Sequence, residues 1–133
     1  MSTAESLQAW LALEHEAVWV HPVIGARFDG LADRARQAYA EHRSTRDRLL
    51  ARLHDLDVDP VATRLTYDVG ALRSPAQAVK VARRLERGIG AACLVLAGDS
   101  TGDLRALALS GLRRAALAEL AWGGHARAFP GLA

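Results

Sequence analysis

The sequence has little of what builds a disulfide-bonded, β-rich or membrane-spanning protein. Its 133 residues include one cysteine, two phenylalanines, two tyrosines and three tryptophans. With only Cys93 present, an internal disulfide is excluded, and the apolar neighbours of Cys93 favour a small buried side chain over a reactive thiol. No apolar run approaches the length of about 20 residues that a transmembrane helix needs.

Charge of one sign is not concentrated anywhere in the chain. There are 17 Lys and Arg and 15 Asp and Glu, which leave a formal net charge of +2 with five histidines counted neutral. We interpret the arginines within 83–87 and 113–114 as solvated helix faces and expect no nucleic-acid partner. Residues 1–8 lack a basic leader region, which predicts a cytoplasmic protein without membrane association.

What the chain does have is helix-forming composition. Half of its residues are hydrophobic, and Ala, Leu, Arg and Glu recur while β-branched and aromatic residues are sparse, which predicts an all-α fold. The length suits one domain, residues 1–133, with a sizeable core.

Two helices are predicted in the first half. Ser2 and Glu5 have capping-box spacing, and apolar positions then recur at a helical period to about residue 28. Pro22 is expected to bend or break this helix. A second helix is predicted over residues 31–56.

A long connection precedes the second half, because residues 57–73 show no helical period. Ser74 followed by proline and Gln77 opens a third helix that ends near residues 98–99. Ser100 is predicted to cap a fourth helix, which stops at residues 123–124. We expect Phe129, in the tail, to pack across an open end of the bundle.

Two short connections and one long one predict two antiparallel hairpins joined by a crossover. This is the connectivity of a ferritin-like four-helix bundle. An up-down-up-down bundle is the second alternative, because it needs no connection of this length.

One polar side chain per predicted helix falls on the apolar stripe: Glu14, His42, Glu86 and Glu119. Buried charges are costly unless they are paired or bind metal, so the four could converge on a cation. The place of Glu119 in this cluster has the weakest support. Measured from the turn that joins the third and fourth helices, Glu119 lies farther along its helix than Glu86 lies along the other.

The ligand pattern of a carboxylate-bridged di-metal centre is incomplete. Such a centre takes Glu from two helices and Glu-x-x-His from the other two, yet Tyr39 and Trp122 stand where a Glu and a His are required. Two alternatives remain. In one, hydrogen bonds and ion pairs satisfy the inner carboxylates, with Tyr39, Trp122, Arg43 and Arg46 as partners. In the other, a residual iron or manganese site forms, with Glu41 as a shifted ligand.

The remaining candidates carry weaker signals. No spacing typical of a zinc site joins the other histidines, and we interpret them as surface or rim residues: His15, His21, His54 and His125. Core packing, or in part a dimer contact, is the interpretation for the tryptophans: Trp10, Trp19 and Trp122. Room for a small ligand is a third hypothesis, resting on three small residues: Gly88, Gly90 and Gly111.

The chain resembles a bacterial ferritin-like domain family of unassigned function, found mainly in high-GC organisms. Four segments carry the resemblance: Leu-Ala-Leu-Glu-His-Glu-Ala-Val at 11–18, Ala-Glu-His-Arg at 40–43 with Arg46-Asp47, Asp-Pro-Val-Ala at 59–62, and Phe-Pro-Gly-Leu at 129–132. The resemblance implies the bundle and a cytoplasmic protein, and it implies no established activity or cofactor.

These observations favour a non-catalytic or accessory ferritin-like protein, homodimeric through one helix face. The alternative is an iron- or manganese-dependent oxidase or oxygenase in which Glu14, His42, Glu86 and Glu119 bind the metal. The sequence alone does not decide whether the chain is an enzyme, and it identifies no substrate.

Overall fold

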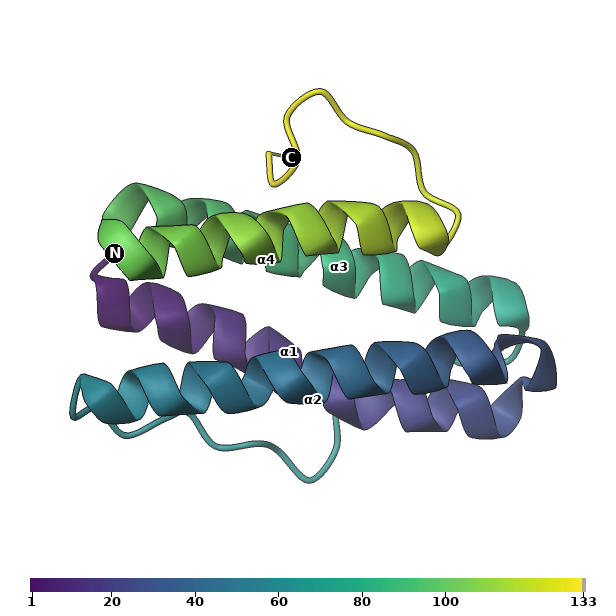
Figure 1. The fold of residues 1–133 in the computed structure, drawn as a ribbon. Helices are drawn as coiled ribbons and strands as arrows, with labels where there is room; N and C mark the ends of the chain where they lie inside the picture. Colours follow the sequence, from purple (N-terminus) through teal and green to yellow (C-terminus); the bar gives the residue numbers. More distant parts are fainter. Residues whose placement is uncertain (133) are drawn as a thin grey trace.

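A computed structural model describes residues 1–132, so Ala133, the last residue of the predicted domain, lies outside the described residues. The fold is all-α, and no strand occurs between residues 1 and 132. Four long helices and one short 3-10 turn follow one another along the chain (Figure 1): α1 Thr3–Arg27, η1 Asp29–Leu31, α2 Ala32–Asp55, α3 Pro75–Asp99 and α4 Gly102–Ala121.

Local sequence explains most helix ends. The predicted capping box is present, because the Ser2 hydroxyl accepts from the Glu5 amide at 3.1 Å and the Glu5 carboxylate accepts from the Ser2 amide at 2.9 Å. Ser74 accepts from the Gln77 amide at 3.2 Å and opens α3, as predicted. Pro22 lies inside α1, which runs through it without interruption.

The cap predicted at the start of α4 is wrong. Ser100 is the C-cap of α3, and its hydroxyl donates to the Leu96 carbonyl at 2.5 Å. The residue that precedes α4 is Thr101, whose side chain makes no capping hydrogen bond. Two polar residues stand side by side at this turn, and the hydroxyl of the first is already engaged by the preceding helix.

The helices form a four-helix bundle of two antiparallel hairpins, α1 with α2 and α3 with α4, as predicted. Residues 56–74 form the crossover, because α2 ends at one end of the bundle and α3 begins at the other (Figure 1). The crossover is tied to α1, where the Gln8 side chain donates to the Asp59 carbonyl and accepts from the Val61 amide, both at 2.7 Å.

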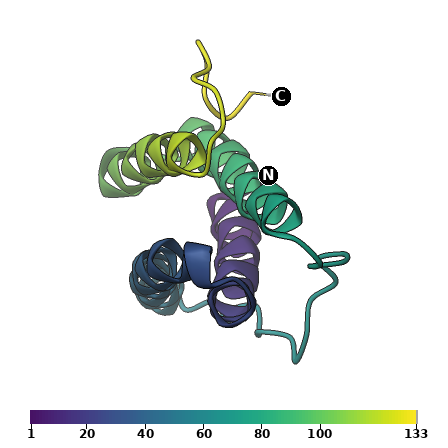
Figure 2. The same cartoon turned by 90° about the vertical axis from the view of Figure 1, so that its right-hand side faces the viewer.

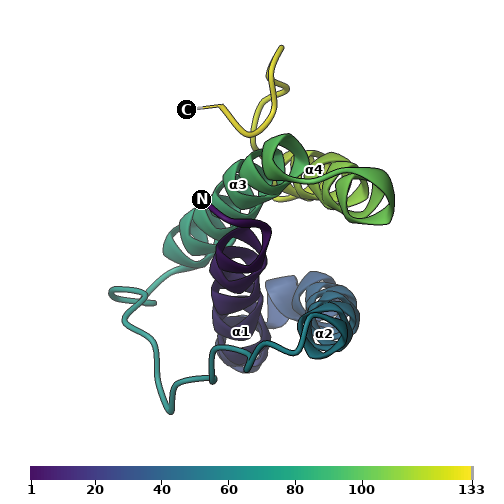
Figure 3. The same cartoon turned by 90° about the vertical axis from the view of Figure 1, so that its left-hand side faces the viewer.

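The bundle is closed on one side and open on the other. Helix α1 packs against both α2 and α3, and α3 packs against α4, whereas α2 and α4 stand apart in the end-on views (Figures 2 and 3). A groove of about 380 Å³ runs between them, and its lining includes charged side chains of both helices and Glu86 of α3. The closed side contains the fully buried apolar core, which includes Leu7, Trp10, Leu11, Leu49, Leu53, Cys93 and Leu96.

The tail does not close the bundle end through Phe129, so that prediction is wrong. Phe129 is 72% exposed. The tail instead turns back over the α3–α4 hairpin (Figure 1), where a side chain on Gly131 would lie 2.9 Å from the Gly90 carbonyl. Among the described residues, no helix combines the length and apolar character required to cross a lipid bilayer.

Candidate functional site

The four polar residues predicted to face inward are all buried: Glu14, His42, Glu86 and Glu119. Three of them meet in the middle of the bundle. His42 from α2 lies between Glu14 of α1 and Glu86 of α3 and contacts both carboxylates. We call Glu14, His42 and Glu86 the central triad.

Both ring nitrogens of His42 face a carboxylate oxygen. Nδ1 lies 2.8 Å from Glu14 Oε2, and Nε2 lies 2.6 Å from Glu86 Oε1. Only the doubly protonated imidazolium donates through both nitrogens. The Trp10 indole N–H donates to the second oxygen of Glu14 at 3.2 Å, so both oxygens of this carboxylate are engaged.

Electrostatics favour the charged form of His42. Burial by itself lowers its pKa, but the hydrogen bonds that His42 donates to Glu14 and Glu86, together with their negative charges, outweigh burial and raise the pKa to about 10. Burial also raises the pKa of Glu86, although the hydrogen bond and charge of His42 oppose this shift. The triad is therefore an imidazolium clamped between two carboxyl groups.

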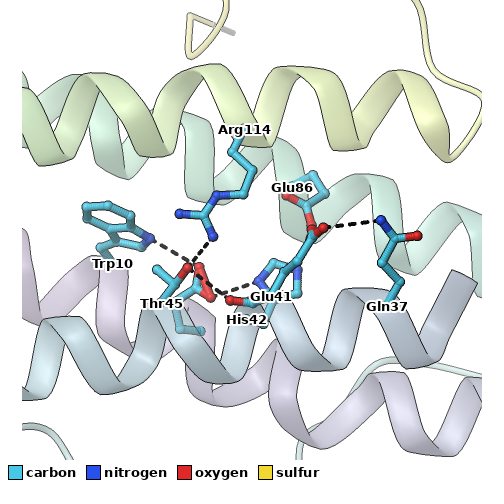
Figure 4. Close-up of polar contacts among 8 residues, drawn as sticks. Trp10, Gln37, Glu41, His42, Thr45, Glu86 and Arg114 are labelled. Atoms are coloured by element: carbon cyan, nitrogen blue, oxygen red, sulfur yellow. Dashed lines mark hydrogen bonds and ion pairs between the residues drawn. The ribbon is translucent and has the colours of Figure 1, made fainter.

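A second cation approaches from α4. Arg114 reaches inward and donates to the Thr45 hydroxyl (Figure 4), and its positive charge acts to lower the pKa of Glu86. Thr45 in turn donates to the Glu41 carbonyl at 3.1 Å. Two cationic side chains thus face two buried carboxylates, and the interior can be neutral overall without a metal ion.

Glu119 does not join the central triad. Its carboxylate is paired with Arg87 at 3.0 Å and with Arg127 of the tail at 3.6 Å, at the rim between α3, α4 and the tail. The partners proposed from the sequence are not those observed, because the inner carboxylates are held by Trp10, His42, Arg87 and Arg127.

The residues present do not fit a di-metal centre. Glu119 is engaged by arginines at the rim, the side chain of Arg114 enters the position next to the triad from α4, and Glu41 is exposed and accepts from Gln37 at 3.3 Å. Two divalent ions need bridging carboxylates, and the centre supplies only Glu14 and Glu86 beside two positive side chains.

His21 is a central residue that the sequence analysis missed. It was interpreted as a surface or rim residue, yet it is fully buried. Its ring stacks with that of His42, at 5.3 Å between centroids and with planes 6° apart, and with that of Trp122, at 5.5 Å and 23°. Leu7, Glu14 and His21 follow one another at intervals of seven, and this heptad spacing was the available signal.

The ring nitrogens of His21 stand out chemically. Neither has a hydrogen-bond partner among the described residues. Burial, together with the positive charge of His42, lowers the pKa of His21 to about 3, so the ring is neutral with a free lone pair. The three side chains His21, His42 and Glu86 each offer one potential metal-ligating atom, and these atoms lie within 4.8 Å of one another.

The remaining histidines, the cysteine and the small residues singled out in the sequence have packing or surface roles. His15 is also buried, with Nε2 at 3.0 Å from the Val61 carbonyl, whereas His54 and His125 are exposed. Burial raises the pKa of the Cys93 thiol, which favours its unreactive form. The space above the three small residues is occupied by side chains, since Leu13 lies over Gly88, Leu112 over Gly90 and Trp10 over Gly111.

Comparison with known proteins agrees with a bundle of unassigned activity. A crystal structure of a conserved hypothetical protein from Mycobacterium tuberculosis superposes with a TM-score of 0.85 at 23% sequence identity, covering 91% of this chain and 87% of that one. This likeness shows a shared fold. No curated protein matches the chain significantly. Residues 6–133 match the family model described as "Domain of unknown function (DUF4439)", and the chain belongs to that family.

Proposed function

We propose that the chain is a ferritin-like four-helix bundle that acts as a non-catalytic accessory protein in the cytoplasm. One observation carries this proposal: both nitrogens of His42 are taken up by the carboxylates of Glu14 and Glu86. The two carboxylates that a di-metal centre would need are thereby committed to a protein cation.

The network has a structural role that needs no turnover. His42 joins α2 to α1 and α3 through two buried charge-assisted hydrogen bonds, and breaking such a pair is strongly destabilising. A slip of α2 along the bundle would leave at least one carboxylate buried without a partner. We propose that the triad selects one register among the apolar alternatives.

An accessory role also implies a surface for partners, and a homodimer through α4 is the form we propose. Three leucines of this helix are 48%, 60% and 40% exposed: Leu109, Leu117 and Leu120. Light scattering on the purified chain is expected to give twice the chain mass, and Leu117→Glu is expected to give the monomer. A native chain that is monomeric at all concentrations would overturn the dimer.

The second candidate is an iron- or manganese-dependent oxidase, favoured by the convergence of Glu14, His42 and Glu86 from three helices. Anaerobic loading with ferrous iron, followed by mass spectrometry and oxygen-electrode measurements, separates the two. The accessory function predicts at most one ion per chain and no oxygen uptake beyond that of the buffer. Two ions per chain, with oxygen uptake that is lost in Glu86→Ala, would establish the oxidase.

A further inference from the structure

Among the described residues, His21 is a buried polar residue that the ion-pair network does not explain. Its side chain is fully buried, and neither ring nitrogen has a partner within residues 1–132. Buried polar groups are nearly always hydrogen-bonded, and each exception calls for a physical reason. A bound ligand that uses a nitrogen lone pair is such a reason.

The surroundings of His21 supply the other donors. One ring nitrogen of His21, one ligand atom of His42 and one of Glu86 all lie within 4.8 Å of one another. Two imidazoles and one carboxylate form the donor set of many zinc and first-row transition-metal sites. In addition, Glu14 holds Nδ1 of His42 at 2.8 Å, as outer carboxylates hold metal-binding histidines.

We propose that His21, His42 and Glu86 bind a single divalent first-row ion of the imidazole-preferring kind, zinc foremost, with Glu14 orienting His42. This inference goes beyond the accessory function. It requires one ion and no oxygen chemistry, and it uses His21 in place of the distant Glu119.

Binding exchanges a proton for the ion. The proton between His42 Nε2 and Glu86 leaves to solvent, Nε2 and the Glu86 oxygen bind the ion, and the Nδ1 proton stays on the bond to Glu14. His21 contributes the lone pair of a neutral ring. One proton is therefore released for each ion bound.

The donors must also move. Ligand atoms around zinc are separated by roughly 3 to 3.5 Å, as follows from metal–nitrogen bonds of about 2 Å, which is closer than the 4.8 Å limit found here. The stacked rings of His21 and His42 are nearly parallel, so at least one ring must rotate before both lone pairs point at one ion. The stack with Trp122 is then lost or shifted.

An entry path leads to the site. The groove between α2 and α4 reaches Glu86 and is lined there by Glu41, Arg114 and Trp122. A solvent ligand can complete the coordination sphere from this side. Arg114 is the charge that opposes the ion, because its guanidinium already acts on Glu86.

The test is titration of the chelator-treated chain with cobalt(II), followed by its visible d–d absorption, and then displacement by zinc. We expect one cobalt per chain. His21→Phe is expected to abolish the spectrum while raising the melting temperature, since it removes two unpartnered buried nitrogens. The matched control is His54→Phe at an exposed position, which should keep the native spectrum.

Two further measurements complete the test. Glu14→Gln should weaken cobalt binding about 10- to 100-fold, as expected for a group that orients a ligand, and calorimetry in buffers of different ionisation enthalpy should show one proton released. No spectrum in the native chain, or an undiminished spectrum in His21→Phe, would overturn the site. Neither result bears on oxygen uptake, so the accessory function is tested separately.

Discussion

Two buried glutamates on the paired helices α3 and α4 have different surroundings. Glu86 and Glu119 are 3% and 6% exposed. Glu86 is bonded to His42, a residue as buried as itself, whereas the arginine partners of Glu119 have side chains that are 51% and 37% exposed. The two carboxylates are buried to nearly the same extent. Their partners differ, because His42 is buried whereas Arg87 and Arg127 are exposed to solvent.

The reach of the partner side chain explains this difference. An imidazole is short, so His42 must itself lie inside the bundle to contact Glu86. Arginine is long and keeps its charged head in water while its stem spans the rim, so Arg87 and Arg127 can reach Glu119 from the surface. The centre therefore has charges removed from water, and the rim has charges that water still screens.

The largest expected effect separates these two sites directly. Glu86→Gln leaves the imidazolium of His42 with one carboxylate instead of two and is expected to lower the free energy of unfolding by about 3 kcal/mol. Glu119→Gln should cost at most about 1 kcal/mol, because its partners are solvated. Urea unfolding monitored by circular dichroism measures both, and equal losses would contradict the distinction between centre and rim.

The centre should also respond to alkaline pH. The pKa of His42 is about 10 in the folded protein and its ordinary value is 6.5, so the folded state keeps a proton that the unfolded state releases between these values. The His42 contribution to stability is therefore complete below pH 6.5 and is lost as the pH rises through 10.

Unfolding free energies of chelator-treated protein between pH 6 and 10 check this expectation. In Glu86→Gln one of the two groups that raise the pKa is gone, so the loss should still begin near pH 6.5 but should be smaller and complete at a lower pH. Glu119→Gln serves as the control and should follow the native curve. Stability that stays constant up to pH 10 would mean that His42 is not an imidazolium.

A further effect, expected to be no larger than that of Glu86→Gln, concerns packing around the centre. A β-carbon on Gly111 would lie 2.5 Å from the Trp10 ring and 2.8 Å from Cys93 Sγ, and Trp10 is fully buried and bonded to Glu14. Gly111→Ala is expected to cost about 1 to 3 kcal/mol through overpacking. A β-carbon on Gly98 would meet no described atom within 4 Å beyond its chain neighbours and the adjacent backbone of its own helix. Gly98→Ala should therefore stabilise by about 0.5 to 1 kcal/mol.

The sequence predicted the fold well because the fold rests on local and periodic signals. Two helix starts are signalled within four residues each, by Ser2 with Glu5 and by Ser74 with Gln77. The helical period of 3.6 residues predicts the inward positions of Glu14, His42, Glu86 and Glu119. Where two polar residues adjoin, as at Ser100 and Thr101, local pattern does not show which helix takes which hydroxyl.

Pairing between helices was less predictable. The partners of Glu14, Glu86 and Glu119 depend on how far each helix is displaced along its neighbour, and a shift of one turn is about 5.4 Å, which is more than a hydrogen bond spans. His21 was missed for a related reason. Its heptad relation to Glu14 is visible in the sequence, but its contact with His42 and Trp122 arises only when α1, α2 and the end of α4 are packed together.

By itself the amino-acid sequence determined an all-α chain, four helices with their approximate ends, one long crossover, and at least one buried polar residue on the inner face of each helix. Those properties follow from composition, capping and helical period, which act within about a turn or two of helix. Only the tertiary structure decided that Glu14 and Glu86 clamp His42, and that Glu119 meets arginines at the rim. It also decided that His21 lies beside the triad without a hydrogen-bond partner among residues 1–132. Distances of a few ångströms between side chains on different helices depend on the register and crossing angle of those helices. Neither quantity is determined by the sequence of one helix alone.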